Sequence, residues 1–150
     1  AEIMWCGSLS HNGLTGCGIC GGDWVTHLIE HELGGMFDVA HGAGLAAVWG
    51  SWARYVMDEK PERFAQFAVD VMGVEESDDV KSTALKGIEA VEEFYRMIEM
   101  PTNMKELGIN PTDEQIKDMA MKATNHDTQQ LGAFKKLSAK DLVEIYKAAK

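Results

Sequence analysis

The sequence predicts an all-α fold, a bundle of about seven helices joined by short loops, with no β-sheet. Apolar residues recur at helical spacing, for example at Val80, Ala84, Ile88 and Val91. No segment shows the alternation of apolar and polar residues that is typical of a half-buried strand. Helix start and stop signals then give the boundaries of each element.

In the first half of the chain, the sequence predicts three helices. A helix over 2–13 ends at Asn12-Gly13 and is followed by a glycine-rich loop, "LTGCGICGG". Asp23 can cap the next helix or lie in its first turn, and this helix runs to about Met36. A turn over 38–44 overlaps the start of an apolar helix over 42–57.

In the second half of the chain, clear start and stop signals separate the expected helices. Pro61 suits the first turn of a helix that Gly73 ends. A long helix follows Ser77 and is broken by Pro101, and a short helix ends at Gly108. Two further helices are expected over 113–124, capped by Thr112, and over 139–149, where Ser138 and Asp141 approach a capping box.

Size and charge limit the possible classes of protein. The 150 residues suffice for one domain with its own core, and no internal boundary, repeat or low-complexity tract divides them. The formal net charge of -10 argues against nucleic acid and anionic membrane as partners, because both require a basic surface. No apolar run reaches the roughly 18 residues of a membrane span.

The three cysteines and the first residues bear on the setting of the chain. An odd number of cysteines favours free thiols in a reducing compartment, so we expect a cytoplasmic protein. The chain opens with Ile3, Met4 and Trp5 almost at once, without a helix cap or a polar lead-in. We therefore expect a segment of a longer protein.

The stretch "THLIEHELGGMFDVAHGAG" holds three of the five histidines within an otherwise apolar sequence. On a helix His27 and His31 share one face, and the apolar surroundings predict that this helix is buried. Buried imidazoles require partners. Two histidines at this spacing, with His41 just beyond the helix end, favour a divalent metal site over histidines bonded to backbone carbonyls.

Two other interpretations of this stretch stay open at this point. "HLIEH" also fits the H-x-x-E-H pattern of inverted zinc peptidases, in which the glutamate is the general base. On a straight helix Glu30 points about 60° away from the direction of His27, which disfavours that role. A free-standing helical binding module with purely structural histidines is the third interpretation.

Two motifs in the glycine-rich loop carry less information. "GCGICG" satisfies G-x-G-x-x-G, but a helix rather than a strand is expected before it, which argues against nucleotide binding. Cys17 and Cys20 form a single C-x-x-C without a second pair, so we interpret them as incidental thiols.

The spacing of His27, His31 and His41, followed by glycine, resembles the signature of the iron-type (group III) alcohol dehydrogenases. The butanol dehydrogenase branch is most similar, through "NGL", "DWVTHLIEHELGGMFDVAHGAGLA", "WARYV" and "MPTNMKELGI". The similarity covers essentially the whole chain. It implies that residues 1–150 are the C-terminal part of a helical metal-binding domain, and that an N-terminal nucleotide-binding domain is absent from this chain.

The resemblance also implies residue roles and cofactors. Family members bind one divalent ion, Fe²⁺ or sometimes Zn²⁺, through an Asp and a His with three residues between them (Asp-x3-His) and through two further histidines whose positions differ by fourteen. The second pair corresponds to His27 and His41, whereas the first would lie before Ala1. His31 corresponds to a histidine near the nicotinamide and the substrate, and is the candidate catalytic residue.

The implied reaction is the interconversion of a primary alcohol and its aldehyde by metal-assisted hydride transfer with NAD(P)H. The partners expected from the resemblance are a small alcohol or aldehyde, the missing N-terminal domain, and further copies of the full-length protein in a homo-oligomer. This chain alone, without the first ligand pair, is expected to be inactive and a poor metal site.

Overall fold

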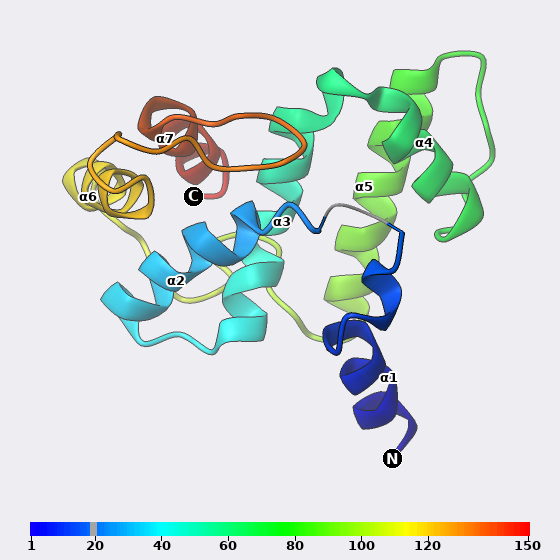
Figure 1. Ribbon diagram of the computed structural model, residues 1–150, viewed down its shortest axis with the longest axis horizontal. Coiled ribbons are helices and arrows are strands. Elements are labelled where there is room, and N and C mark those ends of the chain that lie inside the picture. Colours follow the sequence, from blue (N-terminus) through cyan, green and yellow to red (C-terminus); the bar gives the residue numbers. More distant parts are fainter. Residues whose placement is uncertain (19–20) are drawn as a thin grey trace.

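The computed structural model describes residues 1–18 and 21–150, and it confirms the predicted all-α fold (Figure 1). The described residues contain no strand, and their one isolated bridge pairs Leu131 with Leu137. The elements are α1 (Glu2–His11), η1 (Leu14–Gly16), α2 (Val25–Phe37), α3 (His41–Val56), η2 (Met57–Glu59), α4 (Pro61–Asp70), α5 (Val80–Met97), α6 (Asp113–Ala123) and α7 (Ala139–Ala148).

Helix α3 lies between two groups of helices (Figure 1). On one side it packs against α2 and α7, and these two helices in turn pack against α6. On the other side α3 packs against α5, which pairs closely with α4. None of the helices that the structure describes combines the length and hydropathy needed to cross a membrane.

The larger core cluster fills the space among α2, α3, α6 and α7. Its fully buried members include Ile29, Leu33, Ile116, Leu142 and Ile145. Burying such aliphatic side chains contributes about 1.5–3 kcal/mol each. The opposite side of α2 is thereby left to carry the histidines.

A buried hydrogen bond ties the last helix to the histidine helix. The Tyr146 hydroxyl on α7 donates to the carbonyl oxygen of Ile29 on α2 at 2.7 Å. Burial raises the pKa of Tyr146 well above its ordinary value, so the hydroxyl stays a donor. This bond fixes α2 against the core within one residue of Glu30.

Capping residues explain most of the predicted boundaries. Thr112 and Gln115 form a reciprocal capping box at the start of α6, and Ser138 and Asp141 form another at α7. Pro61 is the first residue of α4, as predicted.

Several details differ from the sequence prediction; for example, the N-cap of α2 is Trp24 rather than Asp23. The turn after α2 is shorter than expected, because Asp38 adopts the left-handed conformation (φ 53°) and α3 already begins at His41. The short helix expected to end at Gly108 is a series of turns instead. There the Glu106 carboxylate accepts from the Thr102 backbone N–H at 2.8 Å, a local bond that competes with helix formation.

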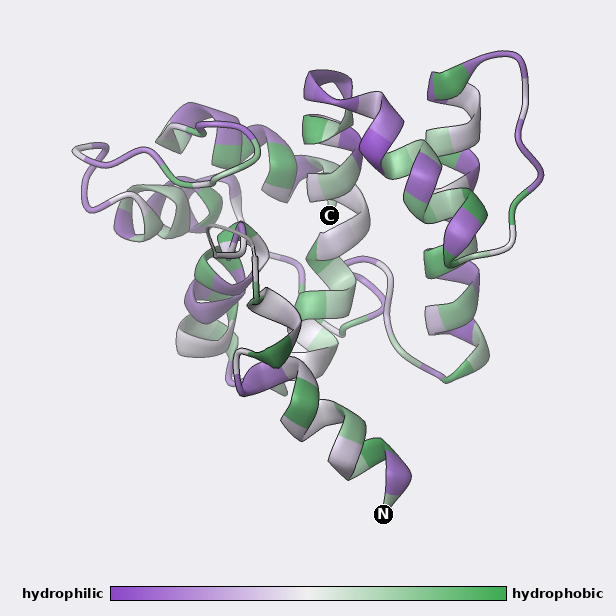
Figure 2. Ribbon diagram, turned by 45° about the vertical axis from the view of Figure 1, so that its right-hand side comes forward, coloured by the Kyte–Doolittle hydropathy of each residue, from purple (hydrophilic) through white to green (hydrophobic). Residues whose placement is uncertain are grey.

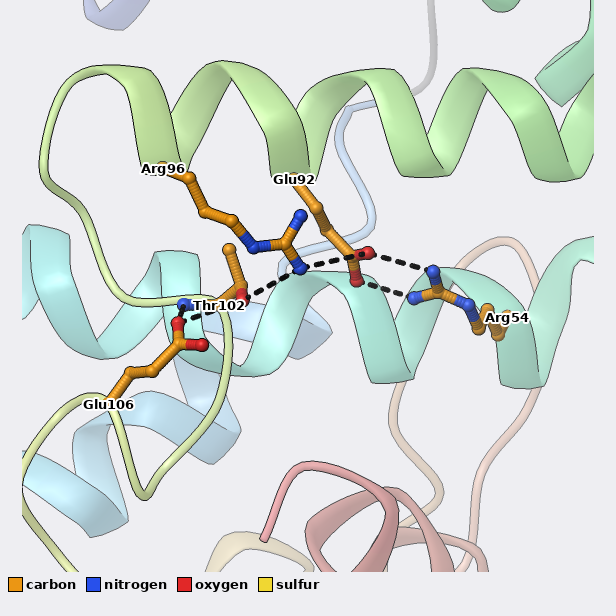
Figure 3. Close-up of polar contacts among 5 residues, drawn as sticks. All are labelled: Arg54, Glu92, Arg96, Thr102 and Glu106. Atoms are coloured by element: carbon orange, nitrogen blue, oxygen red, sulfur yellow. Dashed lines mark hydrogen bonds and ion pairs between the residues drawn. The ribbon is translucent and has the colours of Figure 1, made fainter.

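Ion pairs connect α3 to α5 and to the turns after it (Figure 3). Arg54 donates two hydrogen bonds to the Glu92 carboxylate, at 2.5 and 2.8 Å. Glu92 also lies 3.9 Å from Arg96, which donates to Thr102, and Thr102 donates to Glu106. This bidentate pair and its extension fix the crossing of the two helices.

Helix α1 stands apart from the rest of the described structure. It has no buried residue and packs mainly on η1 (Figure 1). Figure 2 shows hydrophobic segments along it, and the side chains of Ile3, Met4 and Trp5 are largely exposed. These apolar side chains therefore have no partner within the described part of this chain.

Removing the Tyr55 hydroxyl should destabilise the packing of α3 on α7. Tyr55 donates to Asp141 at 2.6 Å, and this bond raises the pKa of Tyr55 to about 12. Tyr55→Phe should lower the free energy of unfolding by about 1.5 kcal/mol, the cost of losing a hydrogen bond to a charged group. Denaturant unfolding at neutral pH measures this, with Tyr95→Phe as control, since burial alone, without a hydrogen bond, raises the pKa of Tyr95.

The same pair gives the pH dependence of this effect. Burial opposes ionisation of Asp141, but hydrogen bonds from Ser138 and Tyr55 hold its pKa below the ordinary 3.8. A lowered folded-state pKa means that this stability is present above pH 3.8 and is lost as the pH falls through the folded-state value. The difference between wild type and Tyr55→Phe should therefore shrink on acidification. A constant difference would contradict the assignment.

Candidate metal centre

Three histidine rings converge between the first two turns of α2 and the first residue of α3. His27 and His31 lie one turn apart on α2, and His41 is the first residue of α3. The ring centroid of His41 lies 5.4 Å from that of His27 and 5.5 Å from that of His31. The three residues singled out from the sequence are thus brought together by the fold.

The local sequence explains this convergence. Val25, Ile29 and Leu33 point α2 into the core, so the histidines lie on the other side of the helix. The chain then reverses within three residues, because Asp38 adopts the left-handed conformation and Ala40 is extended. His41 is thereby carried back beside the two rings on α2.

The expectation that the histidines are buried is wrong for this chain. His27 is half-buried, whereas His31 and His41 are exposed, and the side chain of His41 has 52% of its surface accessible. The apolar character of α2 is explained by the core on one side, and it does not extend to the histidine side. The three rings form an open cluster to which further groups have access.

Glu30 also belongs to this cluster, although the sequence alone gave it little weight. It is 1% exposed, and its carboxylate is in hydrogen-bond contact with Nδ1 of His41. The interpretation of Glu30 as a peptidase base considered only its direction relative to His27. The available signal was an acidic residue directly after Ile29 in a helix that was expected to be buried, where burial would require a partner from another element.

Glu30, His31 and His41 each offer one donor atom, and these atoms lie within 4.8 Å of one another. His27 is outside this closest set, although its ring lies beside both other imidazoles. The donors are imidazole and carboxylate, which suit a first-row divalent ion such as Fe²⁺ or Zn²⁺. The residues present therefore fit the metal that the sequence analysis expected.

Electrostatics favour a neutral ring at His27. Partial burial, and then the neighbouring His41 and His31, lower the pKa of His27 from its ordinary value. A neutral imidazole keeps a lone pair for a metal ion at physiological pH.

Trp24 borders the cluster and was not singled out from the sequence. Its ring packs edge-on against His27, with centroids 4.9 Å apart, and it adopts a left-handed conformation (φ 43°) as the N-cap of α2. Asp23 just before it accepts hydrogen bonds from the backbone of Val25, Ala133 and Phe134. These bonds anchor the start of α2.

The glycine-rich loop follows helical structure, as expected, and no strand precedes it among the described residues. Cys17 is an exposed free thiol. Cys20, the other member of the C-x-x-C, lies outside the described residues.

Comparison with known proteins identifies the class to which this fold and cluster belong. The model of the Fe-containing alcohol dehydrogenase family, C-terminal, matches residues 19–150. The chain belongs to this family, which confirms the resemblance stated from the sequence and decides against the zinc peptidase interpretation.

Individual relatives agree with the family. The chain is 36% identical to a probable NADH-dependent butanol dehydrogenase of Bacillus subtilis, over 98% of this chain and 37% of the relative. It is 30% identical to the NADPH-dependent aldehyde reductase YqhD of Escherichia coli, over 100% of this chain and 38% of the relative. The chain therefore spans little more than a third of the length of these relatives.

Solved structures show the same helical arrangement. The NADH-dependent butanol dehydrogenase A of Thermotoga maritima superposes with a TM-score of 0.85 at 33% identity, over 97% of this chain and 37% of that structure. Escherichia coli YqhD superposes with a TM-score of 0.88 at 28% identity, over 99% of this chain and 37% of that structure.

Proposed function

We propose that this chain contributes half of a metal site to an NAD(P)-dependent alcohol dehydrogenase, which interconverts a primary alcohol and its aldehyde. The convergence of His27, His31 and His41 beside the buried Glu30 carries this proposal. Family membership and the names of the relatives, which are butanol dehydrogenases and an aldehyde reductase, support the reaction type.

In this proposal His27 and His41 bind the ion, and residues 1–150 are the C-terminal part of the helical metal-binding domain. Two imidazoles leave a four-coordinate site incomplete. The family resemblance implies that an Asp and a His in an Asp-x3-His motif, N-terminal to this segment, complete it. The nicotinamide cofactor would be held mainly by an N-terminal nucleotide-binding domain.

The ion, Fe²⁺ or Zn²⁺, would supply a Lewis acid that polarises the alcohol or aldehyde oxygen and lowers the pKa of the alcohol. The residues of this chain would do the rest of the positioning. His27 and His41 would fix the ion from two elements, and Trp24 would restrict solvent beside His27. His31 would accept the alcohol proton in oxidation and return it in reduction.

Removal of the metal is the direct test. In the full-length protein as its gene encodes it, a chelator under anaerobic conditions should abolish NAD(P)-dependent oxidation of 1-butanol. Re-addition of Fe²⁺ or Zn²⁺ should restore it, and metal analysis should give about one ion per chain, as the four-ligand site predicts. Activity that persists without metal would refute the proposal and favour purely structural histidines.

We further propose a homo-oligomeric full-length enzyme in the cytoplasm, acting on small alcohols or aldehydes. The odd number of cysteines and the negative charge support this setting.

A further inference from the structure

We propose that Glu30 is a positioning residue for the metal ligand His41. Its carboxylate accepts the Nδ1–H of the imidazole, which holds the ring in one tautomer and leaves Nε2 free to bind the ion. This inference rests on the proposed function, because it gives His41 the role of a ligand.

The burial of Glu30 is the first argument. Among the described residues it is the one buried carboxylate, and Ile29 beside it is fully buried. A buried carboxylate costs several kcal/mol unless it is paired, so this position on α2 would otherwise favour an aliphatic side chain. The hydrogen bond from His41 is the contact that compensates for this cost.

Helix α3 leaves space for this carboxylate. Gly44 is buried, and a Cβ atom added to it would lie 2.6 Å from Oε1 and 2.7 Å from Cγ of Glu30. On α2 itself, a Cβ at Gly34 would lie 3.4 Å from the same Oε1. Both helices therefore leave space for the glutamate, and its side chain is directed from α2 towards the first turn of α3.

The orientation of the His41 ring depends on Glu30. The side chain of His41 is half exposed, so packing alone does not fix the ring. The contact with a carboxylate that is itself immobilised in the core supplies this orientation.

The test compares Glu30→Leu and Glu30→Gln with wild type in the full-length protein. Leucine matches the apolar surroundings and should fold, whereas glutamine keeps the size and an acceptor oxygen but removes the charge. Glu32→Gln is the matched control, because Glu32 lies on the same helix and faces Lys122 and Asp118 instead. Circular dichroism verifies that each variant is folded.

The first measurement is the affinity for Zn²⁺ and Fe²⁺, determined by competition with a chelator. Glu30→Leu should weaken it by about 10- to 100-fold, the usual effect of losing such a partner, and Glu30→Gln should weaken it less. The control should bind as wild type does. Unchanged affinity in Glu30→Leu would overturn the inference, and so would complete loss of metal in Glu30→Gln combined with retention in His27→Ala, which would make Glu30 a ligand.

The second measurement is the tautomer of His41, from ¹⁵N NMR of ring-labelled histidine before metal is added. Wild type should show the Nδ1–H form, and Glu30→Leu should lose this preference. A wild-type spectrum in Glu30→Leu would overturn the inference even if metal affinity changed. If wild type binds no metal but shows this tautomer effect, the proposed function fails while the contact between Glu30 and His41 is retained.

Discussion

Replacing His27 or His41 by alanine in the full-length protein is expected to remove most of the bound metal and most of the activity. Each change leaves three ligands for a site that uses four. The loss should exceed the roughly 10- to 100-fold effect that removal of an outer partner has on metal binding. Mass spectrometry of the native protein and kinetics with saturating cofactor measure the two quantities.

His126→Ala is the matched control for these variants. His126 is exposed in the turn after α6 and does not belong to the cluster of His27, His31 and His41, so its removal should change neither metal content nor activity. Unchanged metal stoichiometry in both His27→Ala and His41→Ala would reject the ligand assignment. Retention in His27→Ala alone would favour the closer donor set of Glu30, His31 and His41.

Replacing His31 by alanine should reduce kcat per bound metal by about 10²- to 10⁴-fold, while metal content stays close to that of wild type. The ring of His31 lies one helical turn from His27, with centroids 6.5 Å apart, and faces the same open space as His41. A neutral imidazole in this place can accept or return the proton that the alcohol exchanges during the reaction. The measurement is kcat normalised to bound metal across a range of pH.

A structural role for His31 predicts a different pattern. The variant would then lose stability, and its kcat per bound metal would keep both its magnitude and its pH profile. We expect the catalytic pattern instead, with only a small change in the unfolding free energy of His31→Ala, because His31 is exposed in this chain. A loss of metal equal to that of His41→Ala would instead make His31 a ligand.

Much of the fold could be predicted because its signals are local. The capping boxes at Thr112 and Ser138, and the proline that starts α4, act through residues within one turn of each other. The same holds for the spacing of His27 and His31, which placed both rings on one side of α2. The metal hypothesis needed only this spacing and the nearby His41.

The parts that could not be predicted depend on contacts between distant segments. In the segment that was expected to be a short helix, the Met104 backbone N–H donates to the carbonyl of Ala149, which lies beyond α6 and α7 in the sequence. The pairing of Glu30 with His41 requires the reversal of the chain at Asp38, which the apolar pattern does not reveal. The histidine side of α2 was expected to be buried because the apolar pattern alone does not show which sides of a helix are covered by other segments.

The hydrogen bond from Tyr146 to Ile29 has a consequence for biosynthesis. It joins residues 117 positions apart, and it secures the carbonyl that directly precedes Glu30. During translation α2 leaves the ribosome long before α7. Helix α2 therefore lacks the hydrogen bond from Tyr146 while the intervening segments emerge. For this reason we expect the histidine cluster to become rigid only after α7 has been synthesised and has packed against α2.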